Sequence, residues 1–199
     1  DALRPGQEAG SYPGETNVIM SDVVVINKVD VAKKEDVELV RANIKRLNPK
    51  AQIVDAKSTI KIDRPDLVKG KRVLVIEDGP TVTHGQTPYG AGTVAARNMN
   101  AKTVDPHPYA AGSIKDTFEK YKHVGALLPT MGYSAQQIKD LENTIKATPC
   151  DTVLSATPIS LSRIMKIDKP LAIVSYELEE LTKPNLEDVV SDFMKRIKK

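Results

Sequence analysis

The sequence predicts an α/β protein with an open, mostly parallel sheet and helices on both of its faces. Short runs rich in Val and Ile alternate with segments whose apolar residues recur at helical spacing. Polar, Gly or Pro residues follow almost every one of these runs. The 199 residues are 40% hydrophobic and carry 29 Lys and Arg against 26 Asp and Glu. This composition supplies a buried core and excludes a wholly disordered chain.

The predicted strands are four to six residues long, and most of them are continuous runs rich in Val and Ile, which is typical of buried parallel strands. They are residues 22–26, 51–54, 72–77, 101–104, 124–128, 152–156 and 171–176.

The predicted helices lie between these runs, where apolar residues recur every three or four positions. They cover residues 37–47, 93–98, 114–121, 138–145 and 186–197. Ser134 followed by Gln137 predicts a capping box at the start of the fourth of these helices. The alternation of strand and helix predicts right-handed βαβ units.

A polar stretch with Pro65 and Gly70 separates the first two strands from the rest. It predicts two domains, residues 1–68 and residues 69–199, of which the second is Rossmann-like. Two strands are too few for an independent sheet. We therefore expect the missing strands of the first domain upstream of Asp1, with the alternative that both sets share one sheet.

Composition and charge exclude several classes of function. The formal net charge of +3 is spread along the chain, so we expect no nucleic-acid or anionic-lipid partner. Cys150 is alone and cannot form an internal disulfide, which indicates a reducing, cytoplasmic location. No apolar run reaches the roughly 20 residues of a membrane span. The three histidines match no zinc-binding spacing, so no metal site is predicted within the chain.

The most specific motif is Asn27-Lys28-x-Asp30 directly after an apolar strand. In P-loop GTPases this spacing recognises guanine, because the Asp carboxylate accepts hydrogen bonds from the base and the Lys stem lies over its plane. Lys57 and Ser58, after the next strand, resemble the loop that completes such a pocket. We interpret these five residues as nucleotide-binding. The alternative is an ordinary turn in which Asp30 caps a helix.

A glycine-rich segment follows the third predicted strand and opens a helix. Backbone N–H groups at Gly85, Gly90 and Gly92 are candidates for binding a phosphate or carboxylate, with Arg97 and His84 beside them. A flexible glycine turn is an equally good interpretation. No Gly-x-x-x-x-Gly-Lys-[Ser/Thr] motif occurs in the sequence, so the chain itself offers no P-loop for a triphosphate.

Histidines follow two strands at the same predicted edge of the sheet. His84 and His107 are therefore candidates for substrate contact or acid–base chemistry, although a hydrogen-bonded loop histidine is the commoner outcome. His123 lies in a Lys-rich helix end and is expected at the surface.

The chain resembles the archaeal predicted GTPases related to cyclic 2,3-diphosphoglycerate synthetase over nearly its whole length. The segments that carry this resemblance are residues 3–8, 12–17, 22–30, 75–85, 89–92, 104–109, 128–133 and 155–161. In that family the protein is about twice as long, and an upstream half carries the P-loop. The resemblance thus implies that this chain is the carboxyl-terminal part of a P-loop NTPase domain followed by a substrate domain.

The resemblance also implies an activity and its participants. The family's synthetase uses a nucleoside triphosphate, here GTP or ATP, and Mg²⁺ to close a phosphorylated glycerate into a cyclic phosphoanhydride. On this sequence the expected catalytic residues are Asp78, His84 and Arg97. The expected substrate-binding residues are Arg4, Thr83, Gly85, Tyr89, Gly90, Gly92 and His107. The chain alone is expected to be inactive without the P-loop half, and assembly into a homo-oligomer is left open. Two alternatives remain, a regulatory GTP-binding switch and a non-catalytic nucleotide-binding module.

Overall fold

The computed structural model describes residues 1–85 and 87–197, and these fall into two compact units. Unit 1 comprises residues 1–59 together with the chain from residue 176 onward, and unit 2 comprises residues 60–175. This division differs from the predicted domains 1–68 and 69–199. The break falls after Thr59, and the C-terminal segment groups with the first unit, because two long strands each contribute residues to both units.

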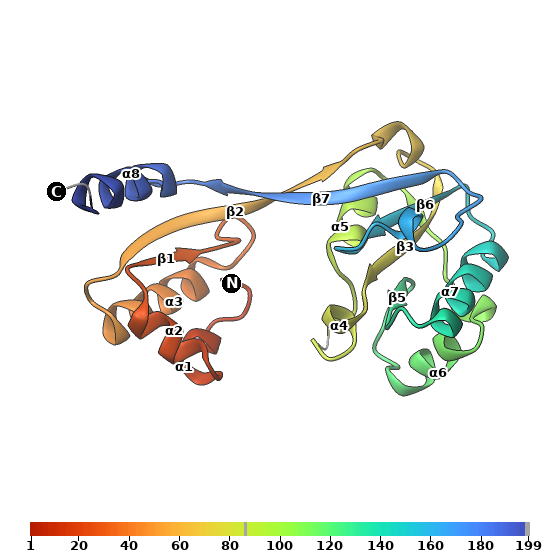
Figure 1. The fold of residues 1–199 in the computed structure, drawn as a ribbon, viewed down its shortest axis with the longest axis horizontal. Coiled ribbons are helices and arrows are strands. Elements are labelled where there is room, and N and C mark those ends of the chain that lie inside the picture. The colour runs from red at the N-terminus through yellow and green to blue at the C-terminus, as the bar shows by residue number, and fades with distance from the viewer. Residues whose placement is uncertain (86, 198–199) are drawn as a thin grey trace. The chain divides into compact units, whose positions relative to one another are not determined.

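Unit 1 is built on two parallel strands and the second half of a third (Figure 1). Its elements are α1 (Gln7–Gly10), α2 (Gly14–Met20), β1 (Val23–Ile26), α3 (Lys34–Leu47), β2 (Gln52–Ile62), β7 (Leu171–Glu180) and α8 (Leu186–Ile197), β2 and β7 being shared with unit 2. Val23 of β1 lies beside Gln52 of β2, and the pairing continues to Ile26 and Asp55. On the other side of β2, the Leu181 N–H donates to the Asp55 carbonyl at 2.7 Å.

A small core holds unit 1 together. The apolar face of α3 buries Val37, Val40 and Ile44 against Ile26 of β1 and Val18 of α2. Acidic residues in the first turn of α3 and basic residues in its last turn match the helix dipole. The packing of α3 against Ile26 fixes the position of the end of β1, where the Asn-Lys-x-Asp motif begins.

Unit 2 is a parallel sheet. Its elements are β3 (Arg72–Asp78), α4 (Gly79–Val82), α5 (Ala91–Asn98), β4 (Lys102–Thr103), α6 (Ser113–Lys120), β5 (Leu128–Thr130), α7 (Ala135–Ala147) and β6 (Thr152–Ala156), with short 3-10 turns at Pro65–Leu67, His107–Tyr109 and Leu161–Arg163. The strand β6 lies between β7 and β3, and β4 and β5 pair with opposite ends of β3. All four of these pairings in unit 2 are parallel, as the sequence predicted.

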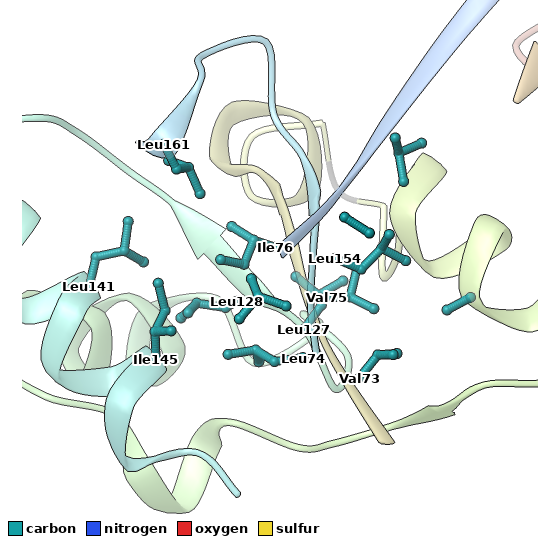
Figure 2. Packing of buried hydrophobic residues seen from close by; sticks show 14 of the residues in the cluster. Val73, Leu74, Val75, Ile76, Leu127, Leu128, Leu141, Ile145, Leu154 and Leu161 are labelled. Carbon is teal, nitrogen blue, oxygen red and sulfur yellow. The ribbon is translucent and has the colours of Figure 1, made fainter. Parts of the chain in front are cut away.

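The core of unit 2 follows the alternation of β3 (Figure 2). Leu74 and Ile76 point toward Leu141 and Ile145 of α7, whereas Val75 points to the other side of the sheet. Every residue from 73 to 76 is fully buried. Helices therefore cover both faces of this sheet, with α5 on one side and α6 and α7 on the other (Figure 1).

The structure contains the predicted strands and helices, adds the short helices α1, α2 and α4, and changes several bounds, of which β7 extends to Glu180 beyond the predicted residue 176. The capping box at Ser134 and Gln137 is present in both directions. The strand β2 continues to Ile62 instead of ending at residue 54. The strand β5 spans Leu128–Thr130, later than the predicted 124–128, because Val124 and Leu127 pack into the core from the segment before it. Within the described residues, no helix has the length and apolar character needed to cross a membrane.

Candidate functional site

The loop after β1 is held by its own Asn side chain. The Asn27 amide donates to Ser58 Oγ at 2.9 Å, and its Oδ1 accepts from the Lys28 N–H at 2.7 Å. The Val29 N–H donates to the Ala56 carbonyl of β2. Lys28 adopts a left-handed backbone with φ of 65°, a conformation that costs energy for a residue with a side chain. The loop is thus tied to β2 at two points.

The Lys28 side chain lies among charged groups. Its Nζ forms an ion pair of 2.6 Å with Asp1 Oδ2, and both side chains are about one-third exposed. Partial burial lowers the pKa of Lys28, and the positive charge of Arg4 lowers it further. Arg4, predicted to bind substrate, therefore lies near the predicted base-binding loop.

Asp30 ends the motif in an exposed position. Among the described residues its carboxylate forms no hydrogen bond and no ion pair, so both oxygens are available as acceptors. The Lys28 carbonyl next to it accepts from the N–H groups of Val31 and Ala32 in a tight turn. Burial of Asp30 against other protein atoms would have removed the base-binding interpretation, and the structure instead leaves this carboxylate accessible.

Lys57 and Ser58 lie inside β2 and not in a loop. Ser58 accepts the hydrogen bond from Asn27, and Lys57 Nζ forms an ion pair of 3.0 Å with Glu179 Oε1 on β7. Asp55, two residues before Lys57 on β2, accepts hydrogen bonds from the Arg41 guanidinium of α3 through both carboxylate oxygens, at 2.9 and 2.7 Å. The predicted nucleotide-binding residues of β2 thus brace the loop and the sheet.

In unit 2, the glycine-rich turn before α5 already surrounds an internal carboxylate. Glu77, at the end of β3, is 2% exposed. Its Oε1 accepts from the N–H groups of Gly90 at 3.1 Å and Thr93 at 2.8 Å and from the Thr93 hydroxyl at 3.0 Å. Its Oε2 accepts from the Gly92 N–H at 3.2 Å. Burial raises the pKa of Glu77, an effect that these hydrogen bonds oppose.

Gly90 and Gly92 are therefore not free to donate to a substrate phosphate in this conformation. A Cβ at Gly90 would lie 2.5 Å from Glu77 Oε2, which explains why the turn requires glycine there. The sequence predicted that this turn binds an anion, and the Glu77 carboxylate of the protein occupies that position.

Tyr89, predicted to bind substrate, and Arg97, predicted to be catalytic, contact each other. The Arg97 guanidinium lies 4.6 Å from the centroid of the Tyr89 ring, and both side chains are exposed. This is a cation–π contact at the surface of α5. Asp78 accepts from the Thr81 hydroxyl at 2.7 Å and stabilises the start of α4.

An open hollow of about 540 Å³ lies beside α4, lined by Thr83, His84, Tyr121 and His123. Buried Thr83 donates its hydroxyl to the Gly79 carbonyl at 2.7 Å and lies 3.1 Å from His84 Nδ1. The Tyr121 hydroxyl lies 3.1 Å from His84 Nε2, and His123 Nε2 lies 2.9 Å from the Val82 carbonyl. Of the predicted residues, Thr83 and His84 line this hollow.

His107 is not one of the residues that line this hollow. Its Nδ1 pairs with Asp105 Oδ1, and its ring stacks on Phe118 at 3.8 Å between centroids. Gly85 follows His84 and packs against the Thr81 carbonyl.

The predicted site residues thus do not form one group. The base-loop residues and Arg4 belong to unit 1, Thr83 and His84 line the hollow of unit 2, and Arg97 of α5 contacts Tyr89, which precedes that helix. Gly90 and Gly92 bond to Glu77, and His107 pairs with Asp105. Sequence reasoning missed Tyr121 and Glu77. His123 is exposed, as predicted, and it also lines the hollow. The apolar spacing of residues 114, 118 and 121 predicted that Tyr121 packs against the core, and it gave no indication that the Tyr121 hydroxyl forms a hydrogen bond.

Among the described residues, no three His, Cys, Asp or Glu side chains lie close enough to hold a metal ion.

Two comparisons with known proteins bear on this arrangement. Residues 6–55 match the model of the CobW/HypB/UreG nucleotide-binding domain, a stretch that contains β1 and the Asn-Lys-x-Asp loop. The chain is 48% identical over 200 residues to a protein of Thermococcus kodakarensis named arginine synthetase ArcE, and this match covers the whole chain and 45% of that protein. The chain thus spans about half the length of the curated relative it matches. In its first quarter it is similar to a nucleotide-binding domain, and along its full length to part of an arginine synthetase.

Proposed function

We propose that this chain forms part of a synthetase driven by a nucleoside triphosphate, in which unit 1 supplies the pocket for the base. The observation that carries the proposal is the geometry of the loop after β1. The Asn27 amide braces this loop through both its nitrogen and its oxygen, and the Asp30 carboxylate is accessible and has no partner among the described residues. The match of residues 6–55 to a nucleotide-binding domain supports this interpretation.

The loop suits guanine better than adenine. Two carboxylate oxygens at Asp30 accept from the ring N–H and the exocyclic amine of guanine, which lie side by side on one edge of the base. Adenine presents no such adjacent pair of donors, so a carboxylate facing it loses hydrogen bonds. The apolar stem of Lys28 covers the face of the base while its ammonium group remains with Asp1. The triphosphate and its Mg²⁺ are held by a P-loop half outside this sequence.

For the substrate, the strongest support comes from the relative that matches the whole chain at 48% identity, which is named for the synthesis of arginine. We therefore propose that the reaction forms arginine or a related compound. The second candidate is the phosphorylated glycerate implied by the family resemblance. The occupation of the glycine turn by Glu77 weakens that candidate, because its expected phosphate-binding N–H groups are already bonded.

The base pocket is tested with the substitution Asp30→Asn in the full-length protein. An amide presents one donor and one acceptor, which match xanthine and not guanine. We expect GTP affinity to fall at least tenfold, about 1.4 kcal/mol, and XTP affinity to rise. The matched control is Asp22→Asn, an exposed carboxylate just before β1. A variant that binds GTP and XTP as the wild type does would remove Asp30 from the base pocket.

The substrate is tested by product analysis. The full-length protein is incubated with nucleotide and phosphate acceptors, and phosphorus NMR and amino-acid analysis follow the products. If the reaction forms arginine with release of nucleoside diphosphate and phosphate, its reverse should yield the triphosphate from arginine, nucleoside diphosphate and phosphate. Formation of a cyclic phosphoanhydride from 2,3-diphosphoglycerate would instead favour the phosphoglycerate reaction. Nucleotide turnover that ignores both compounds would favour a regulatory GTPase.

A further inference from the structure

The hydrogen bonds around the hollow in unit 2 fix where its protons lie. The Thr83 hydroxyl has a single proton, and that proton is donated to the Gly79 carbonyl. Thr83 Oγ therefore accepts from His84, so His84 Nδ1 carries a hydrogen. In the neutral imidazole Nε2 is then bare, and it accepts the hydroxyl proton of Tyr121. The order of donors is Tyr121, His84, Thr83 and the Gly79 carbonyl.

The second histidine of the hollow has the opposite tautomer. A carbonyl oxygen only accepts, so the 2.9 Å contact with the Val82 carbonyl requires a hydrogen on His123 Nε2. Nδ1 of a neutral His123 is then an acceptor, and it has no hydrogen-bond partner among the described residues. The Tyr121 oxygen, which donates its proton to His84, also keeps acceptor capacity. At neutral imidazoles the hollow therefore offers acceptors and no free donor from these two side chains.

We propose that this hollow is a ligand site for the N–H groups of a guanidinium or amine, in which Tyr121 is a catalytic residue and His84 a positioning residue that receives its proton. The site is lined by Thr83, His84, Tyr121 and His123 and has room for a group of this size. The identity of the ligand as substrate rests on the proposed synthetase reaction, whereas the acceptor character rests on the hydrogen bonds alone.

The proton transfer balances within the site. A ligand nitrogen gives its proton to the Tyr121 oxygen, and the Tyr121 hydroxyl proton moves to His84 Nε2 across 3.1 Å. The N–H bond of the ligand breaks and a new N–H bond forms on the imidazole. His84 becomes positively charged and still donates from Nδ1 to Thr83. The ligand nitrogen gains an electron pair for attack on an electrophile. The ammonium of Lys120 lies 5.1 Å from the centroid of the Tyr121 ring and stabilises negative charge that develops on its oxygen.

The proton positions are tested by ¹⁵N NMR of the histidine rings in the full-length protein at a pH where both imidazoles are neutral. We expect the Nδ1–H tautomer at His84 and the Nε2–H tautomer at His123. The opposite tautomer at either residue overturns the proposal. This readout requires no activity. Its outcome is also separate from the Asp30→Asn experiment, because failure of nucleotide binding leaves these tautomers unchanged.

Ligand class is tested in the same spectra with two probes, methylguanidinium and inorganic phosphate. We expect methylguanidinium to shift His123 Nδ1 and to bind at least tenfold more weakly after Tyr121→Phe. The control Tyr109→Phe, a partly exposed tyrosine that does not line the hollow, should bind as the wild type does. Tighter binding of phosphate than of methylguanidinium, or equal binding by Tyr121→Phe, would overturn the assignment.

The role of His84 is tested by separating turnover from binding. His84→Gln keeps a donor and an acceptor but cannot take up a proton. We expect kcat of the full-length enzyme to fall at least tenfold while methylguanidinium affinity stays within threefold of the wild-type value. A fall in affinity as large as the fall in kcat would assign His84 to binding and contradict the relay.

Discussion

The carboxylate of Glu77 organises the turn before α5, and its removal gives the sharpest test of the fold of unit 2. Glu77→Leu keeps the volume and removes the acceptor of four hydrogen bonds. Gly92 and Thr93 are buried, so water does not replace the lost partner of their N–H groups. Each buried unsatisfied donor costs about 1–3 kcal/mol. The two together predict a loss of about 4 kcal/mol, or roughly 8–16 °C in Tm for a chain of this size.

Glu77→Gln separates hydrogen bonding from charge. The amide oxygen retains the three bonds made at Oε1, whereas the amide NH2 is a donor and cannot accept from the buried Gly92 N–H. The neutral side chain avoids the burial of charge that raises the pKa of Glu77. We expect this variant to lose about 1–3 kcal/mol at neutral pH, for one unpaired donor, and so to be more stable than Glu77→Leu. Because the folded-state pKa is raised, the wild type loses stability as pH increases from the ordinary pKa of Glu through the raised value. Glu77→Gln removes this pH dependence.

The assay is thermal unfolding followed by circular dichroism across pH, with Glu77→Ala as a third variant. Alanine leaves a space bordered by unpaired donors, so acetate should raise the Tm of Glu77→Ala and not that of Glu77→Leu, whose side chain fills the space. Three results would refute the reasoning. They are a Glu77→Leu variant within 1 °C of wild type, a Glu77→Gln variant as unstable as Glu77→Leu, and equal effects of acetate on the Ala and Leu variants.

Two further predictions concern the junction of α6 and α7. Asp140 accepts from the Ser113 N–H and hydroxyl at 2.9 and 2.8 Å, and these bonds lower its pKa. Its contribution to stability is therefore present above the ordinary pKa of Asp and is lost as pH falls through the lowered value, so Asp140→Asn should flatten the acid limb of the Tm profile. An unchanged acid limb would contradict this. Gly112 has φ of +47°, and a Cβ there would lie 2.4 Å from the Asp140 carboxylate, whereas Gly70 has φ of +68° and open space around it. Gly112→Ala should cost at least about 1 kcal/mol more than Gly70→Ala in urea unfolding, since both positions have a positive φ that disfavours a Cβ but only at Gly112 does the Cβ also meet a side chain. Equal losses would show that the contact with Asp140 is harmless.

Local patterns predicted the longer helices and the positions of the strands, because most strands contain a run of Val, Ile and Leu and each of these helices has a regular apolar face. The length of β2 was missed for an identifiable reason. Residues 55–61 carry polar side chains at every second position, and the resemblance to a base-binding loop favoured a turn. The alternation of Val54, Ala56, Ile60 and Ile62 was the signal of a continuing strand, since these residues share one face.

The candidate site was predictable only where neighbours in the sequence are neighbours in space. Asn27 and Asp30 act within one loop, so their spacing carried the information. Glu77 and Gly92 are 15 positions apart, and nothing local indicates that the strand end fills the turn. Likewise His84 and Tyr121 meet only because the packing of α6 brings the end of that helix beside α4. Because of such tertiary contacts, Glu77 occupies the glycine turn that the sequence predicted as an anion site. For the same reason Tyr121, which was predicted to pack within a helix, donates its hydroxyl proton to His84.

The interruption of unit 1 by unit 2 has a consequence for synthesis on the ribosome. Residues 60–175 are continuous, so they can acquire their structure as soon as they emerge. Unit 1 must wait, because Asp55 bonds to Leu181 and Thr182, and Lys57 to Glu179. Residues 1–59 therefore lack the second half of β7 while residues 60–175 fold. Of the two units, the one whose first residues are translated earlier is completed later.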